Sequence, residues 1–188
     1  MNRLMLAGAA LAALASGPAF AQSFEGPYVG AQAGWNHDIA IHDDKDAAVG
    51  GVFVGYDHHV TPNVVLGAEG GFSLAASDRI GPSGTDAATI DPHYSFDLSA
   101  RAGYVLGERN LLYVRGGYAN MRGRFTQTAG SNVLTGNQTY DGWFAGGGIE
   151  RKLLDNVSTR LEYRFVDFDG NGRDFQRHQV LAGVAYRF

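Results

Sequence analysis

Hydrophobic and polar residues alternate with a period of two in eight stretches of this chain. The clearest stretch is YSFDLSARAGY (94–104), in which aromatic, leucine and alanine residues take every second position and Ser, Asp, Arg and Gly take the others. Such alternation predicts β-strands with two different faces. The eight predicted strands cover residues 27–35, 51–57, 63–74, 94–104, 111–119, 142–150, 157–165 and 180–188.

The connections between these stretches alternate between long and short. The long ones are residues 36–47, 75–93, 120–141 and 167–177, and the short ones are 58–63, 105–110 and 153–156. An even number of strands with long and short connections at opposite ends is typical of outer-membrane barrels, in which the short turns are periplasmic. The pattern therefore predicts an all-β, eight-stranded, antiparallel up-and-down transmembrane β-barrel with both termini in the periplasm.

The residue types on the two faces favour a membrane barrel over a soluble one. An eight-stranded interior is just wide enough for side chains to fill, so five or six bulky apolar residues per strand would not fit inside it. In a membrane the apolar face meets lipid and the glycine-rich, charged face fills the lumen. The alternative is a soluble periplasmic barrel that binds a lipid and keeps its charged face in solvent. The predicted lumen network consists of Arg101, Arg115, Arg160, Arg164, Arg187, Asp57, Glu69, Asp97, Glu150 and Glu162.

Aromatic residues lie near both ends of the predicted apolar face. Tyrosine and tryptophan gather at membrane interfaces, so two aromatic girdles are expected. The girdle near the long connections contains Trp35, Phe72, Tyr94, Tyr118, Trp143 and Phe165, and the girdle near the short turns contains Tyr56, Tyr104, Tyr186 and Phe188.

The first 21 residues have the features of a secretory signal peptide. Arg3 precedes an apolar run from Leu4 to about Ala15, and Ala19-Phe20-Ala21 forms a small-x-small cleavage signal. The run is shorter than the ~17–25 residues of a spanning helix, which disfavours the alternative of an N-terminal anchor. We expect cleavage after Ala21 and a single barrel domain over residues 22–188.

Composition narrows the function classes further. The chain has a formal charge of −4 and no clustered basic segment, so a nucleic-acid partner is not expected. It has no cysteine, so an exported protein of this sequence does without disulfides. Many of its 27 glycines fall inside the alternating stretches, which indicates crowding on one face.

These segments together resemble a known family. GPYVGAQAGW, VFVGYD, NVVLGAEGGFS, LSARAGYVL, LLYVRGGYA, GGGIE, RLEYRF and the final AYRF are similar, in this order, to the eight-stranded outer-membrane barrels that include opacity-type surface antigens, the membrane half of OmpA and small porin-family proteins. The resemblance implies location in the outer membrane and contact with its lipid and lipopolysaccharide. It also implies that Tyr186 and Phe188 form a signal for the barrel-assembly machinery.

Metal or haem binding has two candidate sites. Asp167, Asp169, Asn171 and Gly172 match the start of a calcium loop, but the position that needs a bidentate glutamate holds His178, which favours an ordinary acidic loop. Four histidines fall in or beside the long connections, where imidazole could bind a metal or haem iron, whereas His58 and His59 fall at the opposite end. We expect no cofactor. The sequence leaves open whether haem or a metal binds to His37, His42, His93 or His178.

A catalytic pair is the third candidate. His93 and Ser95 are two residues apart, as in barrels that edit lipid A, so both side chains would share one face. Ser95 has the phase of Asp97 and Arg101 and is expected to point into the lumen, away from an acyl substrate. We therefore expect no enzyme. We favour a closed barrel that serves envelope integrity and surface interaction, and its four external loops are expected to contact host or surface ligands. A narrow pore for small solutes is the alternative.

Overall fold

Eight antiparallel strands form most of the described part of the chain. The computed structural model describes residues 23–40, 43–75, 88–129, 132–169 and 175–188. The predicted fold class is confirmed by strands at the positions that the alternation indicated. Their bounds are β1 Gly26–Ala40, β2 Asp43–Thr61, β3 Val64–Ala75, β4 Ala88–Leu106, β5 Asn110–Ala129, β6 Asn132–Lys152, β7 Val157–Asp169 and β8 Phe175–Arg187.

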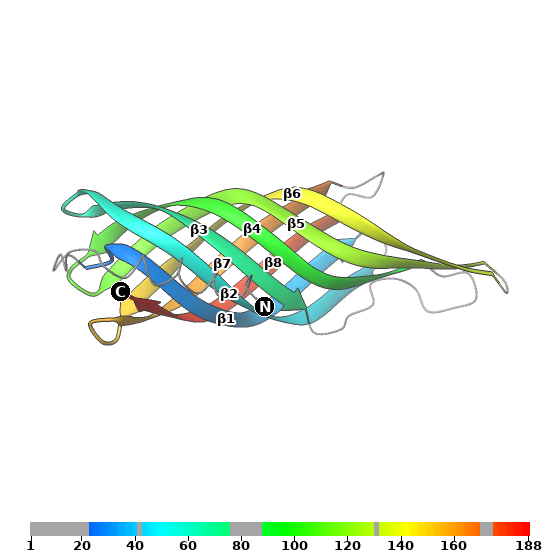
Figure 1. The fold of residues 1–188 in the computed structure, drawn as a ribbon, viewed down its shortest axis with the longest axis horizontal. Helices are drawn as coiled ribbons and strands as arrows, with labels where there is room; N and C mark the ends of the chain where they lie inside the picture. Colours follow the sequence, from blue (N-terminus) through cyan, green and yellow to red (C-terminus); the bar gives the residue numbers. More distant parts are fainter. Residues whose placement is uncertain (1–22, 41–42, 76–87, 130–131, 170–174) are drawn as a thin grey trace, which may run out of the picture.

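The strands close into a barrel in chain order (Figure 1). Each strand pairs with its neighbour in sequence, and β8 pairs with β1 from Tyr28↔Arg187 to Ile39↔Gln176. The backbone of Phe188 continues this ladder, because its N–H donates to the carbonyl of Pro27 at 3.1 Å. Closure pairs the backbone N–H and C=O groups that an open sheet would expose at its two edges. Lipid requires this pairing because it offers these groups no other partner.

The strands extend farther at one end of the barrel than at the other (Figure 1). At the end that we call the turn end, two to four residues join β2 to β3, β4 to β5 and β6 to β7. At the opposite end, which we call the extended end, the β5–β6 hairpin projects beyond the other strands. Its ladder runs without interruption from Asn110↔Arg151 to Ala129↔Asn132.

The prediction of long loops is therefore wrong for much of the extended end. Residues 36–40, 43–47, 88–93, 120–129, 132–141, 167–169 and 175–177 were expected in connections and are strand. Antiparallel neighbours continue the backbone ladder whatever their side chains are. Where water can reach both faces, the side chains need not alternate, and the period-two signal disappears.

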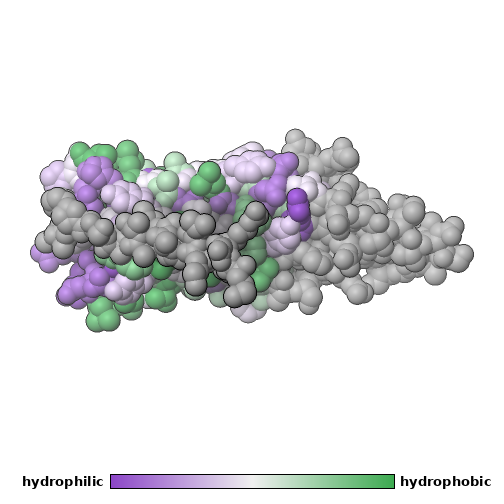
Figure 2. Space-filling view, in the orientation of Figure 1, coloured by the Kyte–Doolittle hydropathy of each residue, from purple (hydrophilic) through white to green (hydrophobic). Residues whose placement is uncertain are grey.

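Many large hydrophobic side chains are exposed on the outside of the barrel wall, and Figure 2 shows some of them as separate green patches. Leu98, Val114, Leu161 and Val180 are each at least half exposed. Exposed apolar side chains in this number suit a wall that faces lipid better than one that faces water. Among the described residues, no helix is long and apolar enough to span a membrane.

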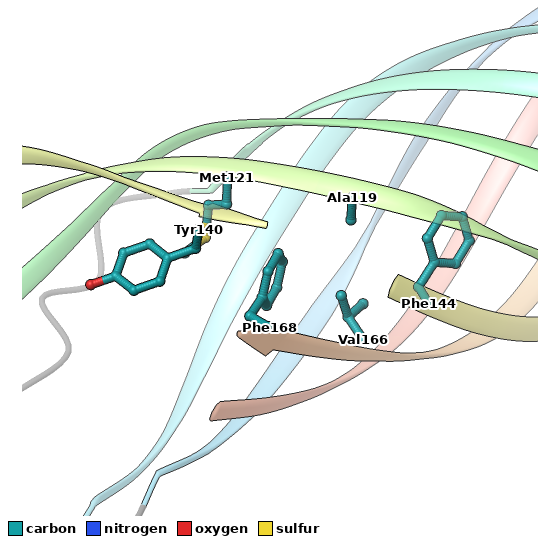
Figure 3. Packing of buried hydrophobic residues seen from close by; sticks show 6 residues of the cluster. All are labelled: Ala119, Met121, Tyr140, Phe144, Val166 and Phe168. Atoms are coloured by element: carbon teal, nitrogen blue, oxygen red, sulfur yellow. The ribbon is translucent and has the colours of Figure 1, made fainter. Parts of the chain in front are cut away.

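Among the described residues, side chains pack inside the barrel at three levels. Phe24, Val65, Val105, Leu111 and Tyr113 pack at the turn end. Charged residues occupy the middle, beside Tyr28 and Phe53. Figure 3 shows the cluster at the extended end, to which β5, β6 and β7 each contribute two side chains: Ala119 and Met121, Tyr140 and Phe144, and Val166 and Phe168.

Candidate functional site

The structure brings all ten predicted lumen residues together inside the barrel. Nine of them are buried, and the side chain of Asp97 is 7% exposed. They come from β2 to β8, and each contacts at least one residue of opposite charge. We call this set the charge network: Arg101, Arg115, Arg160, Arg164, Arg187, Asp57, Glu69, Asp97, Glu150 and Glu162.

Glu69 lies at the centre of the charge network. Its carboxylate accepts hydrogen bonds from Arg115, from Arg160 at 2.7 and 3.1 Å, and from the Tyr28 hydroxyl at 2.9 Å. Arg101 lies 3.8 Å away. A buried carboxylate is stable only when it is paired and hydrogen-bonded, and Glu69 meets both conditions.

The other four carboxylates extend the network around the lumen. Asp97 lies 2.5 Å from Arg115 and 3.5 Å from Arg164. Glu162 accepts from Arg164 at 2.8 and 3.0 Å and from Tyr113 at 2.8 Å.

Near the turn end, Glu150 and Asp57 share cations. Glu150 accepts from Arg101 at 2.5 Å and from Ser158 at 2.7 Å. Asp57 accepts from Arg187 at 2.9 Å, and Arg101 lies 3.7 Å from it. Because each cation except Arg160 lies near two or more carboxylates, and Glu69 lies near three cations, the network is one connected unit.

Aromatic rings support the arginines, and the sequence did not reveal this. The guanidinium of Arg160 lies 3.5 Å from the centroid of Phe53, and that of Arg101 lies 4.1 Å from the centroid of Tyr113. Desolvated guanidinium groups over ring faces are attracted by about 2 kcal/mol or more. The alternation placed these rings inward, but only the register across strands shows which arginine each ring meets. Arg187 lies over Tyr28, and Arg115 and Arg164 lie over Phe144.

Inward glycines make room for two of these rings. Gly30 pairs with Phe53, and Gly55 pairs with Tyr28, between β1 and β2. A Cβ atom at either glycine would overlap the ring opposite it. The glycine excess of the sequence therefore has a steric cause here, because large inward side chains need a bare backbone beside them.

Phe24 closes the turn end of the barrel. Its side chain is completely buried, and its φ of 69° lies in the left-handed region, which a non-glycine residue adopts only when its surroundings hold it there. Arg187 donates to the carbonyls of Phe24 and Gly26, both at 3.1 Å. The His59 ring contacts the Ser23 carbonyl at 2.7 Å. No period-two signal marks a residue that precedes the first strand, so the sequence analysis missed this one.

The predicted girdle aromatics lie on the outer face. Trp35, Tyr118 and Trp143 near the extended end are 52–65% exposed. Phe72, Tyr94 and Phe165 are partly covered, because they pack against other rings. At the turn end, the exposed fractions of Tyr56, Tyr104, Tyr186 and Phe188 are 47–56%.

The candidate calcium loop does not form a loop at its start. Asp167 and Asp169 belong to β7, whereas Asn171 and Gly172 lie outside the described residues. A strand that began a calcium loop would have to turn back within the first residues of the motif. The first two ligand positions of the calcium-loop motif therefore lie in a strand and not in a loop.

Of the four candidate histidines, the structure describes the side chains of two. His37 and His178 are opposite each other on β1 and β8, and His178 Nδ1 lies 2.6 Å from the Tyr163 hydroxyl. His42 and the side chain of His93 lie outside the described part, and Ser95 lines a cavity in the lumen. Among the side chains that the structure describes, no three His, Cys, Asp or Glu residues are placed to hold a metal ion.

Comparisons with known proteins agree with this architecture. Residues 7–188 match the family described as outer membrane protein beta-barrel domain. The chain is 29% identical to the 31 kDa outer-membrane immunogenic protein of Brucella melitensis, over 88% of this chain and 84% of that protein. It is 30% identical to the 25 kDa outer-membrane immunogenic protein of Brucella ovis, over 88% and 79%.

A solved structure shows the same fold at low identity. The attachment invasion locus protein Ail of Yersinia pestis, in complex with the heparin analogue sucrose octasulfate, superposes with a TM-score of 0.60 and 16% identity. The match covers 87% of this chain and 99% of Ail.

Proposed function

The chain belongs to the outer membrane protein β-barrel domain family, and from that premise we propose that it is a closed barrel that supports the integrity of the outer membrane. The observation that carries this proposal is the charge network. Ten ionisable side chains from seven strands fill the lumen at the level of the lipid-facing wall. An ion that crossed this layer would have to separate buried pairs, which is strongly unfavourable.

Phe24 supports a closed barrel independently of the charges. It fills the mouth at the turn end and packs against Val65, Val105 and Leu111. We assign the turn end to the periplasm, since outer-membrane barrels have short periplasmic turns. The lumen then has two barriers in series, one ionic and one apolar.

The extended end supports a role in surface recognition. The β5–β6 hairpin carries the chain beyond the rest of the barrel, on the side that this orientation exposes to the cell exterior. The Brucella relatives are named immunogenic proteins, which is consistent with surface exposure. The recognition of host or surface ligands, without catalysis, is part of this proposal.

The outer face supports the proposed lipid contacts. Its exposed aromatic residues at both ends suit the interfaces with phospholipid and lipopolysaccharide. Tyr186 and Phe188 face outward with their rings 5.2 Å apart, which leaves both accessible to the barrel-assembly machinery before β8 pairs with β1.

Single-channel conductance tests the closed barrel against the narrow pore. The mature chain, refolded into a planar bilayer, is expected to pass no regular current. A shift between unboiled and boiled samples in gel electrophoresis controls for folding. Regular current steps from folded protein would make it a small porin, and the inward arginines would then line its conducting path.

A further inference from the structure

Two neighbouring histidines on β2 hold the short segment that carries Phe24. His59 Nε2 lies 2.7 Å from the carbonyl oxygen of Ser23, and His58 Nδ1 lies 3.1 Å from Glu25 Oε1. These contacts are made on either side of Phe24, whose completely buried side chain closes the turn end. The charge of the histidines therefore acts on the segment that closes the barrel.

Both ring nitrogens of His59 face carbonyl oxygens. Nε2 contacts the Ser23 oxygen, and Nδ1 lies 3.2 Å from the carbonyl oxygen of Thr61. A carbonyl oxygen only accepts hydrogen bonds, and a neutral imidazole has a single N–H to donate. The neutral ring would leave a nitrogen lone pair against one of the two oxygens, whereas the protonated ring donates to both. This geometry therefore favours the protonated form of His59.

His58 contributes in the same direction, but less. Its contact with Glu25 becomes an ion pair when the histidine is protonated. The side chain of His58 is 62% exposed, and exposed pairs are weak because water and salt screen them. His59 is less exposed and makes two contacts, so the main effect of protonation lies there.

The other charged groups around the two histidines do not oppose their protonation as a set. The β3 residues opposite the histidines are apolar. Next to them on β2, Asp57 is buried and accepts a hydrogen bond from Arg187 at 2.9 Å. The β4–β5 turn carries Glu108 and Arg109, which are exposed and opposite in charge. Glu25 contacts a histidine directly, and its negative charge favours protonation.

The backbone of Phe24 is strained in the closed position. Its φ of 69° lies in the left-handed region, which a non-glycine residue keeps only while its surroundings hold it there. The ring packs in the apolar cluster at the turn end, and Arg187 donates to the Phe24 carbonyl at 3.1 Å. These two interactions do not change with pH, because arginine stays charged. The histidine contacts are the part of the hold that protons can change.

We propose that His59 and the segment Ser23–Glu25 form a proton-controlled latch at the turn end. Histidine side chains ordinarily change their charge between about pH 5 and 8. At the acid end of this range His59 donates to both carbonyls, and the latch is closed. As the pH rises, His59 loses one of the two hydrogen bonds, and Phe24 leaves its position more often. The inference rests on the proposed closed barrel for the role of Phe24, and it adds that protons control this apolar barrier.

A single buried cysteine tests the latch. The chain has no cysteine, so Val65→Cys places one reporter thiol of similar size beside Phe24, at a position that is 1% exposed. The chain is refolded in detergent and treated with a small water-soluble methanethiosulfonate reagent at about pH 5 and about pH 8. The rate is divided by that of Asp155→Cys on an exposed turn, which corrects for ionisation of the thiol. We expect this ratio to be at least tenfold higher at the higher pH, and equal ratios would overturn the proposal.

Variants identify the group that senses the proton. His59→Gln keeps a donor but is neutral at every pH, so the ratio should no longer change with pH. His178→Gln removes a histidine at the opposite end of the barrel and should leave the change intact. A pH dependence that persists in His59→Gln would contradict the assignment.

Phe24→Ala shows whether the ring covers the reporter. Without the ring, the ratio should be high at both pH values, and continued protection of the thiol would contradict the latch. If Val65→Cys does not fold, Leu111→Cys, which is completely buried in the same cluster, serves as the reporter.

Conductance separates the latch from the proposed function. The charge network lies beyond Phe24, so an open latch alone should pass no current. Equal ratios in a barrel that passes no current would refute the latch and leave the closed barrel. Regular current together with a pH-dependent ratio would refute the closed barrel, and the latch would then control access to a pore.

Discussion

The two halves of the barrel interior are built from the same strands but held together by different interactions. In the half that includes the turn end, arginines and carboxylates pair over aromatic rings, next to the apolar cluster around Phe24. In the extended half, Met121, Tyr140, Val166 and Phe168 pack as they would in a water-soluble protein. The difference follows the surroundings of the wall: where the outside is apolar, the inside can be ionic. Strand periodicity alone does not decide which residue type lies inside.

Removing Glu69 should lower the free energy of unfolding more than any other change, because it disrupts the ion pairs of the half that contains the charge network. Glu69→Ala leaves Arg115 and Arg160 without their central partner. Loss of one member of a buried ion pair costs about 3–5 kcal/mol, and we expect the upper end of that range. Urea unfolding in lipid vesicles, followed by the fluorescence of Trp35 and Trp143, measures the change. Asp155→Asn, on an exposed turn, is the control, and equal stability of both variants would contradict a central role for Glu69.

Arg101→Ala should have the next largest effect. Glu150 would retain Ser158, with Arg187 3.6 Å away, and Asp57 would retain Arg187. The loss should therefore be about 3 kcal/mol, at the lower end of the range for broken buried pairs, or should appear as leakage. The same unfolding assay and single-channel recording measure both. A variant with normal stability and no current would remove the main support for a lumen closed by ion pairs.

The sequence predicted these two residues but not their surroundings. Alternation determines the face of a residue, so Glu69 and Arg101 were placed inside. Their partners depend on the stagger between strands far apart in the chain: Arg160 meets Gln32 from the opposite end of the sequence, at 2.6 Å. No local pattern contains that information, and pairing with a particular ring or carboxylate could not be predicted.

The extended half was predicted less well for a different reason. Asn36, Tyr140, Phe168 and Arg177 fell in segments that were expected to be connections, yet all four are buried in the barrel. These segments do not alternate clearly, because they need no lipid-facing side. The backbone ladder, which the sequence does not encode residue by residue, extends the strands into them.

Phe168→Ala should show that the two halves contribute differently to stability and to closure of the lumen. It removes a buried ring from the cluster at the extended end and should destabilise the barrel by about 3 kcal/mol. Because the charge network is untouched, the variant should still pass no current. Phe96→Ala, on the lipid-facing wall, is the matched control and should change stability less, since half of its side chain is already exposed. Current through Phe168→Ala would show that the apolar cluster also closes the lumen.

The smallest effect is expected for a Glu–His contact outside both halves, which is an ion pair when the histidine is protonated. Glu25 lies 3.1 Å from His58 at the turn end, and the His58 side chain is 62% exposed. Exposed pairs contribute about 0–1 kcal/mol because water and salt screen them, so Glu25→Gln should lower the free energy of unfolding by less than about 1 kcal/mol. Raising the salt concentration should abolish this small difference, while the difference for Glu69→Ala should persist, since buried charges are screened much less. If high salt reduced both differences equally, the charge network would be accessible to ions, and the distinction between a sealed ionic half and an exposed rim would no longer hold.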